Sequence, residues 1–349
     1  MGNTAPRPWA WAAAVLCCLL LIAVARAEAR DIVDMKGRTL TIPDEITKVV
    51  GVSPPGTYLL YAMDPSLVAG FNFPLWDSER KYTVPLYHRL PVVGGLAGQS
   101  RTMNKEVLLK VRPDFLLHWA WREDSSNDKF LASMAAMPFP VVCVHMEGIA
   151  DYPPALRFVG EVTGRKARGE ELAHYAEEAL AAATKTAAAI PAERRVRVYY
   201  AEGTDGLSTE PEHSVHAELI PLAGGVNVHK GTEVDHYGME KISMEQLLLY
   251  DPAVILVKER TLFATMYDDP RWKRLKAVRE GRVYLIPYAP FNWFDRPPSF
   301  MRLLGVKWLL NLLHPEEAPF DMVAETRAFY SLFLGVTLSD DEARQVLNR

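Results

Sequence analysis

Aromatic and cationic side chains are concentrated in the loops that follow the predicted strands of this 349-residue chain. In a parallel α/β sheet these loops lie at the carboxyl ends of the strands, where ligands bind. Arginine binds anions through paired hydrogen bonds, and aromatic faces attract cations and planar groups. The loops therefore suit an anionic, partly planar metal chelate. The residues predicted to contact such a ligand are Pro54, Trp119, Trp121, Arg122, Arg260, Asn292, Trp293 and Arg296.

Two histidines offer a second kind of chemistry. His213 and His216 are three residues apart near the start of a predicted helix, and this spacing can place both imidazoles on one face to bind a metal. The alternative is that both are surface residues, which is the more common role of such histidines. Because the chain has no clear set of three or four ligands for a bare divalent ion, a metal chelate or a metal oxyanion is the favoured ligand.

Two similar segments indicate which elements position these loops. Residues 103–117 and 242–256 share a glutamate, Glu106 and Glu245, followed at matching offsets by a leucine pair, a proline and an apolar triplet. Each segment predicts a short amphipathic helix, a proline that ends it and a buried strand, which is one step of a parallel sheet. Two copies of the step predict two similar lobes.

The segment between the two copies is rich in Ala, Glu and Lys and predicts one long helix over residues 154–190. The predicted fold class is α/β, with two Rossmann-like lobes bridged by a single long α-helix and a ligand cleft between the lobes. The predicted division is an N-terminal α/β lobe over residues 28–152, a linker helix over 153–192, and a C-terminal α/β lobe with terminal helices over 193–349.

The N-terminus has the features of a cleavable signal peptide over residues 1–27. Arg7 precedes an apolar run, and Ala25-Arg26-Ala27 is a small-x-small cleavage site. A membrane anchor is the alternative, although the run is short for a span. Lipid attachment at Cys17 or Cys18 is disfavoured because neither is preceded by the small residue that a lipobox requires. We expect export to the periplasm.

Composition excludes several classes. A formal net charge of −4 leaves no electrostatic footprint for nucleic acid. Cys143 is the only cysteine after residue 27, so the mature chain has no internal disulfide and no cysteine cluster for a metal. The chain also lacks a Gly-x-Ser-x-Gly elbow, a His-Glu-x-x-His helix and a P-loop. An enzyme is therefore disfavoured, as is a structural or adhesion module because of the Rossmann-like pattern.

The order of elements, the repeated step and the closing text Asp269-Pro270-Arg271-Trp272 to Gly281-Arg282-Val283-Tyr284 resemble the substrate-binding proteins of ABC importers for iron-siderophores, cobalamin and related metal cargoes. The resemblance implies lobes joined by one rigid helix with little domain movement, and a monomer that meets an ABC permease and its ATPase. It also implies that Glu106 and Glu245 dock onto permease arginines; both can equally be solvated charges at helix starts.

The cargo is the open question at this level. An iron-siderophore-type chelate is the first expectation, and it is cargo, so no resident cofactor is expected. Molybdate, tungstate or a nickel chelate is the alternative, because residues 294–302 also resemble a branch of the family with such cargoes. The loop Gly203 to Gly206 offers backbone N–H groups to an oxyanion, whereas Asp205 within it would repel one.

Overall fold

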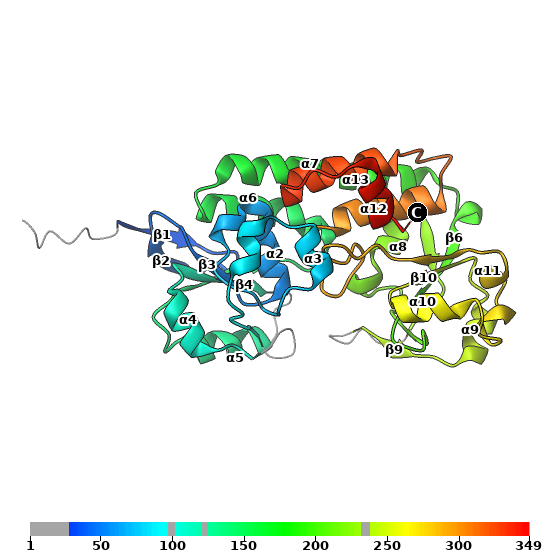
Figure 1. The fold of residues 1–349 in the computed structure, drawn as a ribbon, viewed down its shortest axis with the longest axis horizontal. Coiled ribbons are helices and arrows are strands. Elements are labelled where there is room, and N and C mark those ends of the chain that lie inside the picture. The colour runs from blue at the N-terminus through cyan, green and yellow to red at the C-terminus, as the bar shows by residue number, and fades with distance from the viewer. Residues whose placement is uncertain (1–27, 97–101, 121–124, 232–237, 349) are drawn as a thin grey trace, which may run out of the picture.

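The computed structural model describes residues 28–96, 102–120, 125–231 and 238–348, arranged as two α/β lobes side by side (Figure 1). The predicted signal peptide lies outside the described residues. Within the described part, no helix is long and apolar enough to span a membrane. The predicted fold class is confirmed.

The N-terminal lobe is built on a parallel sheet in the order β3-β4-β5, and an antiparallel hairpin precedes it. Strand β4 is buried at all six positions, which is why it reads as a continuous apolar run. The elements are β1 (Ala29–Val33), β2 (Thr39–Pro43), β3 (Val49–Gly51), α2 (Pro54–Met63), α3 (Asp77–Lys81), α4 (Lys105–Val111), β4 (Phe115–Ala120), α5 (Ser125–Met134), β5 (Val141–His145) and α6 (Tyr152–Val162).

The C-terminal lobe repeats this plan with a parallel sheet in the order β11-β10-β6-β8. Its elements are β6 (Val196–Ala201), β7 (Ser208–Thr209), α8 (Leu219–Leu222), β8 (Gly225–Asn227), β9 (Glu240–Lys241), α9 (Met244–Tyr250), β10 (Val254–Val257), α10 (Arg260–Met266), α11 (Lys276–Arg279), β11 (Val283–Leu285), α12 (Arg302–Leu313), α13 (Met322–Phe329) and α14 (Asp340–Val346). A π-helical turn, Tyr330–Leu334, continues α13.

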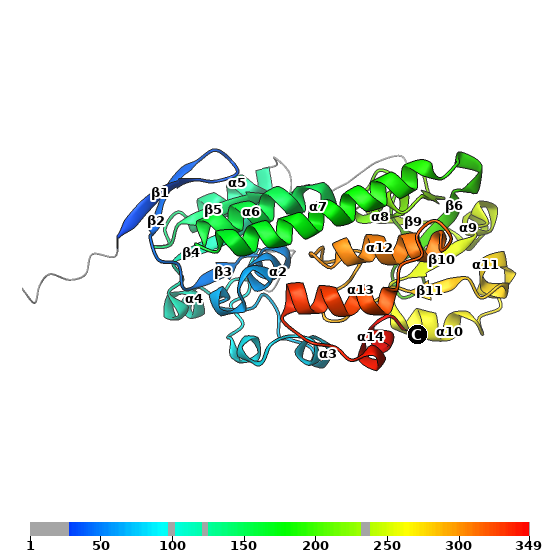
Figure 2. The same cartoon turned by 90° about the horizontal axis from the view of Figure 1, so that it is seen from above.

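The bridging helix is α7 (Lys166–Ala189), whose 24 residues span about 36 Å. It runs along both lobes, beside α6 (Figures 1 and 2). The single helix predicted over residues 154–190 is therefore two helices. Gly164, at φ +72°, lies in the turn between them, a conformation that glycine adopts without strain. The chain reverses there and α6 packs against α7.

The repeated step is present in both lobes. Helices α4 and α9 each end at a residue with left-handed φ, Arg112 and Asp251, followed by a proline and the strand β4 or β10. Helix α4 begins at an Asn104 cap and α9 at a Ser243 cap. The two lobes therefore form this step with the same local structure.

The C-terminal helices also contact the N-terminal lobe. The Tyr61 hydroxyl on α2 donates to the carbonyl of Leu334 at 2.8 Å, and Lys81 on α3 donates to the side chain of Gln345 at 3.1 Å. One hydrophobic core runs from Phe115 through Leu172 on α7 to Phe300. The lobes are thus joined by α7, by the terminal helices and by a shared core.

Candidate ligand-binding site between the lobes

The lobes meet through the loops at the carboxyl ends of their strands. The backbone N–H of Ile149, after β5, donates to Glu218 of the C-terminal lobe at 2.8 Å. A small space of about 10 Å³ lies at this junction. Its lining comes from both lobes and comprises Trp119, Met146, Glu147, Gly148, Tyr152, Val215, His216, Pro298 and Arg302.

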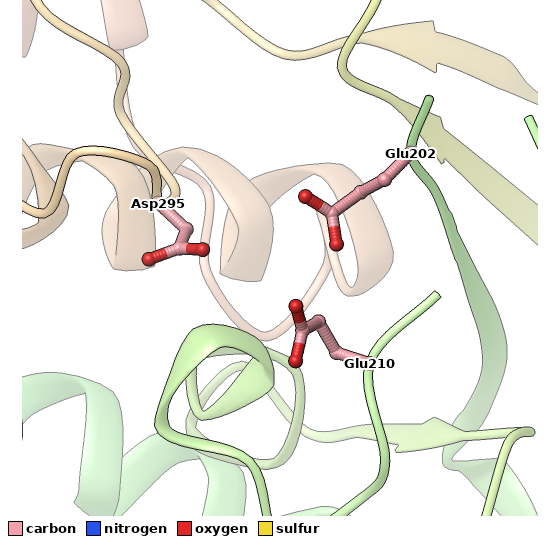
Figure 3. A group of neighbouring side chains, drawn as sticks. All are labelled: Glu202, Glu210 and Asp295. Atoms are coloured by element: carbon pink, nitrogen blue, oxygen red, sulfur yellow. The ribbon is translucent and has the colours of Figure 1, made fainter. Parts of the chain in front are cut away.

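The C-terminal lobe carries a buried cluster of charges at this face, which we call the acidic triad: Glu202, Glu210 and Asp295 (Figure 3). Their exposed fractions are 0%, 0% and 1%. Glu202 follows β6, Glu210 follows β7, and Asp295 lies in the loop after β11. One carboxylate oxygen from each lies within 4.8 Å of the others.

Arg296 lies among the three carboxylates of the triad. Its Nε lies 3.3 Å from Glu202 and 3.4 Å from Asp295, and its Nη2 donates to Glu210. Lys258 adds a second positive charge, with Nζ 3.5 Å from Glu202. Three carboxylates could hold a hard cation, but the guanidinium already supplies positive charge to all three. A metal ion would have to displace it.

Neighbouring side chains fix the triad. Ser214 donates to Glu210 at 2.7 Å, and His216 Nδ1 lies 2.7 Å from Asp295 Oδ1. The Asn292 side-chain oxygen accepts the N–H groups of Phe294 and Asp295 at 2.7 and 2.9 Å. Asn292, predicted to contact ligand, therefore shapes the loop that carries Asp295.

Burial sets the protonation of the triad. Burial and the neighbouring Glu202 raise the pKa of Glu210 to about 8, against the opposing charge of Arg296. Burial likewise raises the pKa of Glu202. Burial would also raise the pKa of Asp295, yet the contacts with His216 and Arg296 hold that pKa below its usual value. Of the three carboxyl groups, Asp295 is therefore the one held in its ionised form, whereas burial favours the protonated form of Glu210.

The predicted aromatic and cationic residues have different surroundings, and Trp119 lines the small space at the lobe junction. Trp119 is 8% exposed and donates through its indole N–H to Met146 at 2.9 Å, and Trp293 is fully buried. Arg260 is exposed at the start of α10, a helix where a loop was expected. Trp121 and Arg122 lie outside the described residues. Large aromatic residues pack in cores as readily as they bind ligands, so their type alone did not separate the two roles.

The two histidines do not form a pair. The side chain of His213 is 79% exposed and lies 3.5 Å from Glu212, whereas His216 is buried against Asp295. His216 lies in a short 3-10 turn, Val215–Ala217, rather than in the α-helix that was predicted to carry both histidines. The structure therefore gives no support to a metal site shared by His213 and His216.

A larger cavity of about 250 Å³, which we call the aromatic cavity, lies beside the start of α2 and contains the predicted residue Pro54. The C-terminal lobe contributes Tyr288 and Pro297 to its wall. The full lining is Pro54, Thr57, Tyr58, Phe71, Asn72, Phe73, Pro74, Leu75, Trp76, Glu79, Tyr87, Tyr288 and Pro297. The residues predicted from sequence comprise neither this set nor the acidic triad, although Pro54 lines the cavity and Arg296 contacts the triad.

The two predicted docking residues lie away from these sites. Glu106 and Glu245 are exposed, and each is the second residue of its helix, α4 or α9. Both helices lie on the side of the molecule opposite α7, one at each end (Figure 1). A single partner surface can therefore reach both glutamates.

Comparison with protein families gives a match over most of the chain. Residues 61–290 match the family model described as "Periplasmic binding protein". The molybdate-binding protein MolA of Haemophilus influenzae is 24% identical, over 94% of this chain and 97% of MolA. The vitamin B12-binding protein of Pectobacterium carotovorum is 24% identical, over 60% of this chain and 70% of that protein.

Solved structures resemble the whole fold. An ABC transporter solute binding protein from Sulfurospirillum deleyianum superposes with a TM-score of 0.85 at 35% identity, covering 92% of this chain and 99% of that one. The Haemophilus influenzae MolA structure bound to molybdate superposes with a TM-score of 0.71 at 22% identity, covering 89% of this chain and 99% of that one.

Proposed function

This chain belongs to the periplasmic binding protein family, and we propose that it captures a small metal oxyanion, of the molybdate or tungstate kind, between its lobes. Its relatives are solute-binding proteins of ABC importers, and the chain is a binding protein rather than an enzyme. The partners that follow are an ABC permease and its ATPase. The protein acts as a monomer after its signal peptide is removed in the periplasm.

The oxyanion is proposed because this chain is similar to a protein named for molybdate binding. The similarity extends over nearly the full length of both chains. The lobes share a core and are crossed by the terminal helices, so they resist wide separation. The space at their junction, about 10 Å³, holds no more than about one water molecule, so an oxyanion would enter only if the lining side chains moved. Arg302 and His216 line that space and carry N–H groups of the kind that bind oxyanions. Arg302 already donates to the carbonyls of Phe294 and Val215 and pairs with Glu218, so an oxyanion would share its guanidinium with these groups.

A ferric siderophore or another organic chelate is the second candidate. It is favoured by the aromatic cavity, whose volume of about 250 Å³ can take a ring. An engineered cavity of about 150 Å³ holds benzene. Trp119, Trp293 and Arg260, on which the siderophore expectation depended, do not line this cavity.

The test is elemental analysis of protein purified from the periplasm, followed by thermal-shift measurements with molybdate, tungstate, ferric siderophores and nickel-histidine. Ligand at about a hundred times its dissociation constant adds about 2.7 kcal/mol to the free energy of unfolding. We expect molybdate or tungstate to raise the melting temperature, with sulfate and phosphate as negative controls. A shift with a ferric siderophore alone would replace the oxyanion and keep the carrier role.

A matched pair of variants tests the site. Arg302→Lys removes the planar fork while keeping the charge, and should weaken oxyanion binding about tenfold or more. Arg260→Lys makes the same change at an exposed position and should leave binding unchanged. Equal binding by both variants would place the oxyanion elsewhere.

A further inference from the structure

The aromatic cavity has a rim of large apolar side chains that protein packing leaves uncovered. Trp76, Phe73 and Tyr288 are 68%, 44% and 40% exposed. Exposed aromatic residues gathered around one opening are typical of a binding site. Inside, Tyr58 stacks on Phe291 with ring centroids 3.8 Å apart, which fixes one wall as a flat aromatic face.

Most polar groups of the lining are already satisfied by the protein. The Thr57 hydroxyl donates to Asn72 Oδ1 at 2.7 Å, and the Asn72 side-chain amide donates to the carbonyls of Gly51 and Gly94 at 2.8 and 3.1 Å. The Thr57 hydroxyl and the Asn72 amide therefore have no free O–H or N–H to donate to a ligand. Besides Glu79, the polar groups that remain in the lining are the hydroxyls of Tyr58, Tyr87 and Tyr288.

Glu79 is the only carboxylate among the described residues of the lining. It is 9% exposed, and its Oε2 accepts the backbone N–H of Trp76 at 2.6 Å. Among the described residues no group bonds Oε1. A carboxylate in an apolar cavity is stabilised by a cation or by N–H donors, so its natural complement is a positively charged group.

We propose that the aromatic cavity binds a small organic molecule that combines a planar ring with an ammonium group, the ring lying among Tyr58, Trp76 and Tyr288 and the ammonium pairing with Glu79. The volume fits one substituted ring: it exceeds the about 150 Å³ that holds benzene. Because Tyr288 and Pro297 come from the C-terminal lobe, the bound molecule touches both lobes. This inference rests on the cavity and not on the identity of the metal cargo.

The groups around Glu79 determine how pH should affect the binding of an ammonium group. The groups that face it are Arg80 on its own helix and the tyrosines 58, 87 and 288 from three other segments. Burial raises the pKa of Glu79 to about 7, partly offset by the Trp76 N–H and Arg80. The tyrosines stay neutral, since burial raises the pKa of each of them. Binding of an ammonium should therefore strengthen as pH rises from 6 to 8, roughly, while Glu79 ionises.

Three probes separate the parts of the proposal. Calorimetric titration of the full chain with phenethylamine tests ring and ammonium together, 3-phenylpropanoate keeps the ring with a negative charge, and butylamine keeps the ammonium without the ring. We expect binding of phenethylamine only. Equal binding of 3-phenylpropanoate would overturn the charge preference and would favour an anionic chelate. Equal binding of butylamine, or no binding of phenethylamine at millimolar concentration, would also overturn the proposal.

Variants test the residues. Glu79→Gln keeps the shape of the side chain, and Trp76→Ala removes an exposed ring; each should weaken phenethylamine binding about tenfold. Leu86→Ala, at a 56% exposed position outside the lining, is the matched control and should bind normally. Molybdate-induced thermal shifts, measured on the same samples, should be unchanged in all three. Failure of this proposal is thus distinguishable from failure of the oxyanion proposal.

Discussion

Arg296 provides the positive charge that pairs with the acidic triad of the C-terminal lobe. Its backbone has a φ of +43°, a left-handed conformation that is costly for a residue with a side chain. That backbone carries a guanidinium that contacts all of Glu202, Glu210 and Asp295. Strain of this kind persists where the surroundings hold the residue in place, and here the buried carboxylates do so.

Removing the Arg296 side chain should lower the free energy of unfolding. Arg296→Ala leaves buried carboxylates without their main partner, and breaking one side of a buried ion pair costs roughly 3–5 kcal/mol. We expect the free energy of unfolding at pH 7, measured by urea denaturation, to fall by about that amount. Arg260→Ala, at an exposed position, should change it by less than about 0.5 kcal/mol. Equal stability of the two variants would mean that the cluster contributes nothing.

The acidic triad should also give stability a recognisable pH dependence. The pKa of Glu210 is raised to about 8 in the folded protein, so between the ordinary glutamate pKa and pH 8 the folded state binds the extra proton. Stability from this group is fully present below the ordinary pKa and is lost as pH rises through 8. Asp295, whose pKa is lowered, acts in the opposite sense and only at more acidic pH.

The variant Glu210→Gln isolates this effect. We expect denaturation curves recorded from pH 5 to 9, roughly, to show stability falling with pH more steeply in the natural protein than in Glu210→Gln. The two should differ least at the acidic end of this range, where Glu210 is largely protonated in the unfolded chain as well, and the difference should grow until the pH passes about 8. Parallel pH profiles would show that Glu210 has an ordinary pKa.

Residue types alone predicted the region of the site better than its members. Pro54 and Arg296 were selected from loops after strands; Pro54 lines the aromatic cavity and Arg296 contacts the acidic triad. Trp293 was selected by the same argument and is buried in the core. Whether an aromatic ring faces solvent depends on the elements that pack over it, and a single sequence does not contain that information.

At the scale of elements, the sequence predicted those helices and strands that are determined by residues close together in the chain. The helix, proline and strand of each repeated step have their own caps and apolar runs, and both steps are present. Strand β8 has no such local pattern, because Gly225 and Asn227 have low strand propensity. Its pairing with β6 is set by the neighbouring strand rather than by its own residues.

The break between α6 and α7 shows how glycines set helix packing. A methyl group at Gly169 would lie 2.7 Å from the carbonyl oxygen of Leu156 and 3.0 Å from the Cα of Gly160. Only glycine lets the two helices approach this closely. Gly169→Ala should therefore force them apart and lower the free energy of unfolding by roughly 1–3 kcal/mol, although alanine is the better helix former.

The measurement is thermal and urea denaturation of Gly169→Ala beside Ala181→Gly. The second change, at an exposed position of the same helix, should cost only about 1 kcal/mol from helix propensity. A stabilised Gly169→Ala would show that the helices can separate without loss and that α7 is not held tightly against α6.

At the scale of the molecule, the connections between the lobes limit how cargo can enter. Besides α7, the turn after α13 accepts a hydrogen bond from Tyr61, and the ring of Tyr330 packs edge-on against Tyr82 of the N-terminal lobe. These contacts join residues more than 200 positions apart, so no local pattern revealed them. We retain the boundaries 28–152, 153–192 and 193–349 as the proposed division, with the terminal helices shared between the lobes.

The wide separation of α4 and α9 gives the docking proposal its test. Glu106→Ala with Glu245→Ala removes one exposed charge from each lobe, and the structure around both is only a capped helix start. We expect cargo affinity and melting temperature to stay the same. Binding to the permease and stimulation of its ATPase should fall at least about tenfold, because opposed charges at an interface govern encounter and register.

The matched control is Glu161→Ala with Glu178→Ala, two exposed glutamates on α6 and α7, on the face opposite α4 and α9 (Figure 1). This control removes the same net charge from the far side of a rigid body. If it impairs transport equally, the permease responds to overall charge rather than to two placed carboxylates. If only the α4 and α9 variant fails, and each single variant fails in part, the spacing of the two lobes is itself the feature that the permease recognises.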